Sequence, residues 1–104
     1  GKEGVTVRQL LTHTAGLREW YPFYQLNRRT KAQILAFICA DRPKYEVGQG
    51  PKYSDLGMII LGRLVELVAG QALDEFVEQR LFWPLGMTST GFRRVGELRW
   101  DPAV

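Results

Sequence analysis

The stretch Tyr53-Ser54-Asp55-Leu56-Gly57 and the apolar run that follows it, Met58 to Gly70, decide the fold of this chain. Ser54 or Asp55 can serve as a helix N-cap, because either side chain can accept a hydrogen bond from a free N–H of the first turn. Within the run only Arg63 and Glu66 carry charge. A helix that is apolar nearly all round is typically buried. We therefore expect a buried central helix with Tyr53 at its N-terminal end.

Length and composition limit the classes of protein that fit. The chain has 104 residues, of which 45% are hydrophobic and 24% charged, which is typical of one small globular domain. We accordingly predict a single helical domain over residues 1–104. The net charge is +3 and the basic residues are scattered, so we expect no nucleic acid partner. No apolar run is long enough to cross a bilayer, so we expect no membrane span.

The chain has one cysteine, Cys39, and one histidine, His13. Because they are far apart in the sequence, we predict no metal site, and we expect no cofactor. Cys39 falls in an apolar helical pattern and is expected to be a small buried residue rather than a nucleophile. His13 lies in a turn that ends at Gly16, where glycine supplies a left-handed or tight backbone position. We interpret His13 as a hydrogen-bonded turn residue rather than a general base.

Two helices are predicted in the first half of the chain, each preceded by a threonine. Thr6 can cap a short helix over Val7–Leu11, and Thr30 can cap one from Lys31 to about Ala40. The apolar residues that we expect to face inward are Leu10, Leu11, Ile34, Leu35, Phe37 and Ile38.

A further helix is predicted from Leu73 to Phe82, ended by Pro84. The residues expected on its inner face are Leu73, Phe76, Val77 and Leu81. Leu85 to Thr88 is expected to form a compact turn, and residues 91–95 a short strand or an extended tail. The fold class predicted from these elements is mainly α, with long loops and little strand.

Three segments in a fixed order carry a resemblance. They are Leu10-Leu11-Thr12-His13-Thr14-Ala15-Gly16-Leu17, then Tyr53-Ser54-Asp55-Leu56-Gly57 running into Ile60-Leu61-Gly62, then Phe82-Trp83-Pro84-Leu85-Gly86-Met87 followed by Thr90-Gly91-Phe92. Together they resemble the serine β-lactamase-like hydrolases, the family of class C β-lactamases, D-alanyl-D-alanine carboxypeptidases and related esterases. The resemblance covers roughly Val5 to Phe92. It implies the helical subdomain of the β-lactamase and penicillin-binding-protein-like fold, without the α/β sheet domain.

The active site of that family combines three motifs: S-x-x-K, Y-x-N, and a K-T-G or H-x-G strand. The resemblance implies that Tyr53-Ser54-Asp55 is the second motif, with Asp55 in place of the usual asparagine. It thereby assigns Tyr53 and Asp55 as catalytic residues. A register beginning at Ser54, as in the S-D-N form, would need asparagine where Leu56 stands, so the register at Tyr53 is preferred.

The resemblance also implies roles for these residues. A free tyrosine has a pKa of about 10, so only ~0.1% is phenolate at pH 7. Tyr53 would therefore act as a base beside the S-x-x-K lysine, or relay a proton as a neutral phenol. Asp55 would hydrogen-bond that lysine or the amide of the substrate, and its charge favours an esterase-like relative over a strict β-lactamase. The residues implied to border the substrate cleft are Leu17, Arg18, Glu19 and Trp20.

The nucleophile motif is not found among the residues of this chain. Its two serines, Ser54 and Ser89, are not followed by lysine three positions later. We expect the S-x-x-K motif to lie before Gly1 and the third motif after Val104. The first hypothesis is thus a truncated serine hydrolase that is inactive alone. The alternative is a self-standing helical binding or assembly module derived from such an enzyme. Either way the missing sheet domain would leave an apolar surface, so we expect a homo-oligomer, dimeric or domain-swapped.

Overall fold

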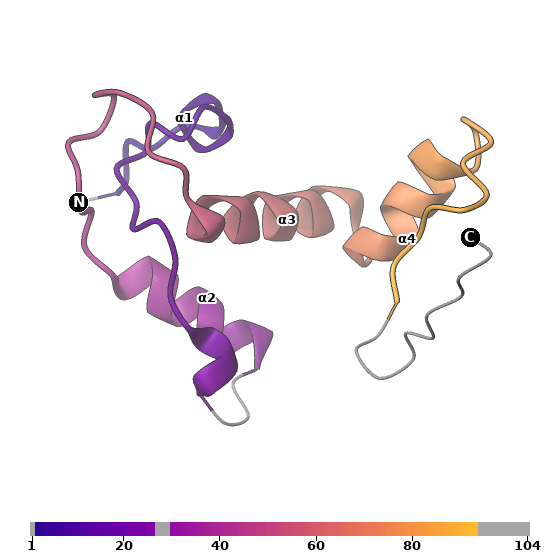
Figure 1. Ribbon diagram of the computed structural model, residues 1–104, viewed down its shortest axis with the longest axis horizontal. Coiled ribbons are helices and arrows are strands. Elements are labelled where there is room, and N and C mark those ends of the chain that lie inside the picture. The colour runs from indigo at the N-terminus through magenta and orange to yellow at the C-terminus, as the bar shows by residue number, and fades with distance from the viewer. Residues whose placement is uncertain (1, 27–29, 94–104) are drawn as a thin grey trace. The chain divides into compact units, whose positions relative to one another are not determined.

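The computed structural model describes residues 2–26 and 30–93. The chain divides into two compact units, Gly1–Val65 and Glu66–Val104. Within the described residues the regular elements are all helical, which confirms the predicted mainly α class. In order they are α1 (Val7–Leu11), a 3₁₀ turn η1 (Phe23–Gln25), α2 (Lys31–Ala40), α3 (Asp55–Ala69), α4 (Leu73–Val77) and a π-helical segment η2 (Glu78–Phe82) (Figure 1).

Both threonine caps predicted from the sequence are confirmed. The Thr6 hydroxyl accepts from the Gln9 amide, and the Gln9 side chain accepts in return from the Thr6 amide. Thr30 and Gln33 form the same reciprocal pair at the start of α2. Each capping box satisfies two N–H groups that a helix start leaves without an intrahelical partner, so α1 and α2 begin where the sequence predicts.

The first unit has a small apolar core. Leu10, Ala15 and Leu17 are its buried members, and the partly buried residues packed against them are Val5, Ile60, Leu61 and Leu64. Leu10 is 5% exposed, as predicted, but Leu11 is 60% exposed. The expectation for Leu11 is wrong because consecutive helical residues point about 100° apart, and only one face of α1 meets the core.

The same geometry corrects the expectation for Cys39. Ile38 on α2 is 1% exposed and takes the inward position, so its neighbour Cys39 faces outward and is exposed. The loop before α2 packs on that helix through rings: Tyr21 and Phe23 lie with their ring centroids 4.3 and 5.4 Å from that of Phe37. These aromatic side chains therefore cover the edge of α2.

Helix α3 is less buried than its apolar sequence predicts. Only Leu56 and Gly57 are fully buried, and its exposed large apolar residues are Met58 at 46%, Ile59 at 37%, Leu67 at 61% and Val68 at 89%. The expectation of a helix buried nearly all round is wrong for the described residues. Composition indicates how much surface a helix can bury, whereas burial also requires neighbours to cover that surface.

The second unit begins with the last turn of α3 and contains α4 and η2. The Trp83 amide donates to the Glu78 carbonyl at 2.9 Å, an i→i+5 hydrogen bond that marks a π turn. Leu81 was expected on the inner face but is 48% exposed, because the wider π turn rotates it away from a 3.6-residue face. The predicted turn after Pro84 is present, with Gly86 at φ +67°. Of the predicted segment 91–95, residues 91–93 have no regular structure, and the remainder lies outside the described residues.

Candidate active site at the start of α3

The motif Tyr53-Ser54-Asp55 lies at the start of α3. The Ser54 hydroxyl accepts a hydrogen bond from the Gly57 amide at 3.1 Å, so Ser54 rather than Asp55 is the N-cap. Ser54 is 3% exposed, whereas Tyr53, one residue before it, is 63% exposed. A buried anchor thus holds an accessible phenol beside the helix N-terminus.

The loop after α1 fixes this anchor through three hydrogen bonds. The Ser54 hydroxyl donates to the Arg18 carbonyl at 2.6 Å, and the Asp55 amide donates to the Glu19 carbonyl at 2.7 Å. The Ser54 amide donates to Nδ1 of His13 at 3.1 Å. Both amides and the hydroxyl of the Ser54-Asp55 pair are therefore satisfied by one segment of the chain, which sets the position of Tyr53.

The loop after α1 contains Gly16, which allows it to lie close to the loop that leads to Tyr53. Its carbonyl accepts from the Lys44 amide at 2.8 Å and from the Tyr45 amide at 3.1 Å. Its φ is +71°, and a Cβ added there would lie 2.3 Å from the Tyr45 carbonyl oxygen. The predicted left-handed position of Gly16 is confirmed, and the close approach is a second reason for glycine.

Asp55 sets the electrostatics of the phenol. Hydrogen bonding to the Asp55 carboxylate, reinforced by its negative charge, raises the pKa of Tyr53 above its usual value. A carboxylate partner stabilises the neutral phenol relative to the phenolate. The raised pKa therefore favours the neutral, proton-donating form of Tyr53, and a phenolate would need a cation nearby.

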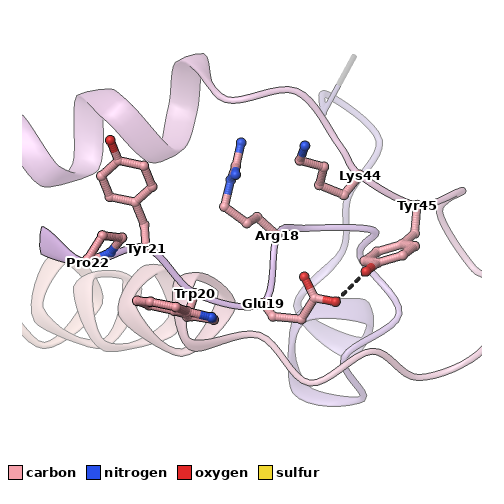
Figure 2. Close-up of a pocket in the computed structure, with 7 residues that line it drawn as sticks. All are labelled: Arg18, Glu19, Trp20, Tyr21, Pro22, Lys44 and Tyr45. Carbon is pink, nitrogen blue, oxygen red and sulfur yellow. Dashed lines mark hydrogen bonds between the residues drawn. The ribbon is translucent and has the colours of Figure 1, made fainter.

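A pocket of about 480 Å³ opens beside the loop that anchors Ser54. Figure 2 shows the seven residues that line it, which are Arg18, Glu19, Trp20, Tyr21, Pro22, Lys44 and Tyr45. Three of the four residues implied to border a substrate cleft are among them. The fourth, Leu17, lies in the core and is 5% exposed.

Two polar pairs hold charged side chains of the pocket wall in place. Arg18 donates from Nε to Oδ2 of Asp41 at 2.9 Å and from Nη2 to Oδ1 at 3.1 Å, and this bidentate pair lowers the pKa of Asp41. The Tyr45 hydroxyl donates to the Glu19 carboxylate (Figure 2), which lowers the pKa of Glu19 and raises that of Tyr45. Lys44 is the lining cation outside these pairs, and Trp20, 57% exposed, offers an open aromatic surface.

His13 has a role that the sequence did not reveal. It is a hydrogen-bonded turn residue, as predicted, but its partner is the Ser54 amide, 41 positions away. Its ring centroid also lies 4.7 Å from that of Tyr53, with the planes at 41°. No regular spacing relates two loops so distant in sequence, so only the three-dimensional structure brings these residues together.

The described residues contain neither a metal-binding cluster nor a single membrane-spanning helix. No group of three or more histidine, cysteine, aspartate or glutamate side chains there could hold a metal ion. No single helix there is long and apolar enough to cross a membrane; α3 meets those criteria only when combined with Leu73–Phe82.

Of the serines, Ser54 is buried and uses its hydroxyl as both donor and acceptor, which is the pattern of a structural serine.

Comparisons with known proteins match nearly the whole chain. Residues 1–99 match the family model described as Beta-lactamase. The chain is 36% identical over 98 residues to an Escherichia coli (strain K12) protein named "Putative D-alanyl-D-alanine carboxypeptidase", covering 88% of this chain and 23% of that protein. It is 30% identical over 96 residues to the "N-acetylmuramyl-L-alanine amidase" of Bacillus subtilis (strain 168), covering 86% of this chain and 22% of that protein.

A solved structure is similar to nearly the whole chain. The crystal structure of a penicillin binding protein from Bacillus halodurans superposes with a TM-score of 0.78 at 28% identity, over 95% of this chain and 33% of that one. The chain thus spans about a quarter of the length of the curated relatives above. The predicted likeness to the helical part of that fold is confirmed.

Proposed function

We propose, from the premise that the chain belongs to the Beta-lactamase family, that it supplies the helical part of a serine β-lactamase-like hydrolase. In this proposal Tyr53 is the proton-relay residue and Asp55 its hydrogen-bonding partner. One observation carries the proposal: Tyr53 is exposed at the start of α3 while its neighbour Ser54 is buried and fully hydrogen-bonded. Proton relay requires a side chain whose backbone is held in place and whose hydroxyl is accessible.

The relay acts on a nucleophile that these 104 residues do not contain. In the family that nucleophile is the serine of S-x-x-K, and neither Ser54 nor Ser89 is followed by lysine at the third position. Acylation needs an activated oxygen, so the chain alone is inert in this proposal. Asp55 raises the pKa of Tyr53, which favours a neutral phenol whose oxygen takes the proton of the serine while its own proton passes to the Asp55 carboxylate.

The substrate would enter beside the pocket-lining loop. Arg18, Glu19 and Trp20 line the pocket, and the carbonyls of Arg18 and Glu19 also accept hydrogen bonds from Ser54 and Asp55. Leu17 would support this loop from the core. The names of the relatives, a carboxypeptidase and an amidase, favour an acyl compound with an amide or ester bond as the substrate class.

Two preparations test this proposal. The first is the 104-residue chain itself, assayed with nitrocefin and p-nitrophenyl acetate, and it should hydrolyse neither above the buffer rate. The second is a chimera in which residues of this chain replace the matching third of the Bacillus halodurans protein. That chimera should hydrolyse at least one of the two substrates. Turnover by the chain alone would contradict the proposal, as would a chimera that melts cooperatively but is inactive.

A second function is favoured by the exposed apolar residues of α3. Leu67 and Val68, consecutive residues near the end of α3, are 61% and 89% exposed, and exposed apolar surface of this kind marks association sites. We propose that the isolated chain forms a homo-oligomer through this surface and acts as an assembly module. Light scattering coupled to size exclusion should then show a mass that rises with concentration. Val68→Lys changes a residue that is 89% exposed, and it should lower the measured mass to that of the monomer. A monomer at every concentration would contradict this.

A further inference from the structure

We propose that His13 is a positioning residue for Tyr53. The inference rests on the proposed function only where it concerns catalysis, because the contacts themselves are structural. His13 touches the motif twice: Nδ1 accepts from the Ser54 amide at 3.1 Å, and the imidazole packs against the Tyr53 ring with centroids 4.7 Å apart. One side chain thus holds both the backbone anchor and the phenol ring.

The hydrogen bond defines the chemical form of His13. A backbone amide can only donate, so Nδ1 must offer a lone pair. The neutral ring therefore carries its proton on Nε2. An imidazolium, or the other neutral tautomer, would leave two donors facing each other at Ser54. The motif is held by one tautomer of one side chain.

The backbone of His13 is held in an uncommon conformation that aims this side chain. Its φ is +56°, a left-handed position that few residues other than glycine adopt, although histidine is enriched there together with asparagine and aspartate. Hydrogen bonds fix it on both sides: the His13 amide donates to the Leu10 carbonyl at 3.2 Å, and its carbonyl accepts from the Lys52 amide at 2.8 Å. Because Lys52 directly precedes Tyr53, the same residue also holds the chain on the other side of the phenol.

Without the imidazole, the phenol would lose its ring neighbour. Tyr53 is 63% exposed, so solvent would offer it alternative rotamers. Catalytic groups displaced by about 1 Å can lose ~100-fold in rate. Removing His13 should therefore reduce catalysis, because Tyr53 would occupy several rotamers, while the fold stays in place.

Nuclear magnetic resonance of the chain tests the contacts directly, since His13 is its single histidine. Its ¹⁵N shifts should show the proton on Nε2 at neutral pH. Three substitutions separate the two contacts. His13→Gly keeps the positive φ and deletes both contacts, so the Ser54 amide should lose exchange protection and the Tyr53 ring protons their ring-current shift. His13→Asn keeps an acceptor and should restore only the amide. His13→Phe keeps a ring and should restore only the ring-current shift.

The proposal is overturned by a proton on Nδ1, or by a His13→Gly variant in which the Ser54 amide and the Tyr53 ring are both unchanged. These outcomes do not depend on any enzymatic activity. If the spectra behave as expected while Tyr53 proves unimportant in catalysis, the proposed function fails and the positioning contact stands.

Kinetics in the chimera test whether the contact acts through Tyr53. His13→Gly should lower kcat by roughly 10-fold to 100-fold with little change in KM. In a Tyr53→Phe background the same change should cost little more, because the hydroxyl that it positions is already gone. An equal loss in both backgrounds would show a general structural role and contradict the proposal.

Discussion

Ser54 Oγ lies 2.6 Å from the carbonyl oxygen of Arg18, and this hydrogen bond joins the start of α3 to the loop that lines the pocket. The same oxygen accepts from the Gly57 amide, so one buried hydroxyl caps the helix and ties it to a second segment. The candidate site is thereby assembled from two parts of the chain without any β-sheet among the described residues.

Replacing Ser54 with alanine should destabilise the first unit. The change deletes the cap and leaves the buried Gly57 amide without its acceptor, so the free energy of unfolding should fall by about 1–3 kcal/mol. Urea unfolding followed by circular dichroism measures this. Ser89→Ala is the matched control, because Ser89 is exposed, and it should stay within about 0.5 kcal/mol of the parent chain. Equal effects from the two substitutions would refute the role of Ser54.

Gly16 and Gly48 provide a second matched pair. Both have positive φ, but an added Cβ would lie 2.3 Å from the Tyr45 carbonyl oxygen at Gly16 and meet nothing within 4 Å at Gly48. Gly48→Ala should cost about 1 kcal/mol from backbone strain alone. Gly16→Ala adds a clash with backbone and should cost about 2–4 kcal/mol. Thermal unfolding of both variants measures which of them loses more stability. A Gly16→Ala variant as stable as Gly48→Ala would contradict the close approach at Gly16.

The Arg18–Asp41 pair predicts a loss of stability in acid. The guanidinium lowers the pKa of Asp41 below its usual 3.8, so the native state binds the proton less readily than the unfolded chain. The stabilisation is present above the unfolded pKa and is lost as the pH falls through the lower, folded value, that is, below about pH 4.

The test is the free energy of unfolding measured between pH 2 and 7. Asp41→Asn should reduce the slope below about pH 4, since one of the carboxyls with a lowered pKa is gone. Arg18→Gln should reduce it too, since the cation that shifts the pKa is gone. A slope unchanged in both variants would exclude this pair as its source.

Two tyrosines should respond separately to the removal of two carboxylates. Asp55 raises the pKa of Tyr53 and Glu19 raises that of Tyr45. Asp55→Asn should lower the pKa of Tyr53 towards its usual 10.0, leaving Tyr45 unchanged, and Glu19→Gln should do the reverse. Titration of ¹³C-labelled tyrosine Cζ atoms by NMR resolves the two residues. A change in the pKa of both tyrosines in either variant would show that the two pairs are not independent.

Local signals predicted much of this fold because they depend on near neighbours. The Thr6 and Thr30 caps, the left-handed Gly16 and the helix start at Ser54 are set by short-range hydrogen bonding, and all are present. Periodicity also predicted the inward direction of Ile38. These features are fixed by backbone geometry within a few residues.

Features that depend on distant residues were not predicted. Burial of α3 was overestimated, since an apolar run does not show what covers it; Val68 is 89% exposed. Cys39 was expected to be buried, but α2 buries the neighbouring Ile38 and leaves Cys39 exposed. The His13 contact with Tyr53 joins two loops, for which sequence periodicity gives no signal.

The most direct measurement of the central claim is kcat/KM for p-nitrophenyl acetate in the chimera carrying Tyr53→Phe. Tyr24→Phe, at a tyrosine that is 81% exposed and not part of the motif, is the control. If Tyr53 relays the proton, removing its hydroxyl should lower kcat/KM by about 10²-fold or more, whereas the control should change it less than about twofold. Equal activity in the two variants would contradict the account.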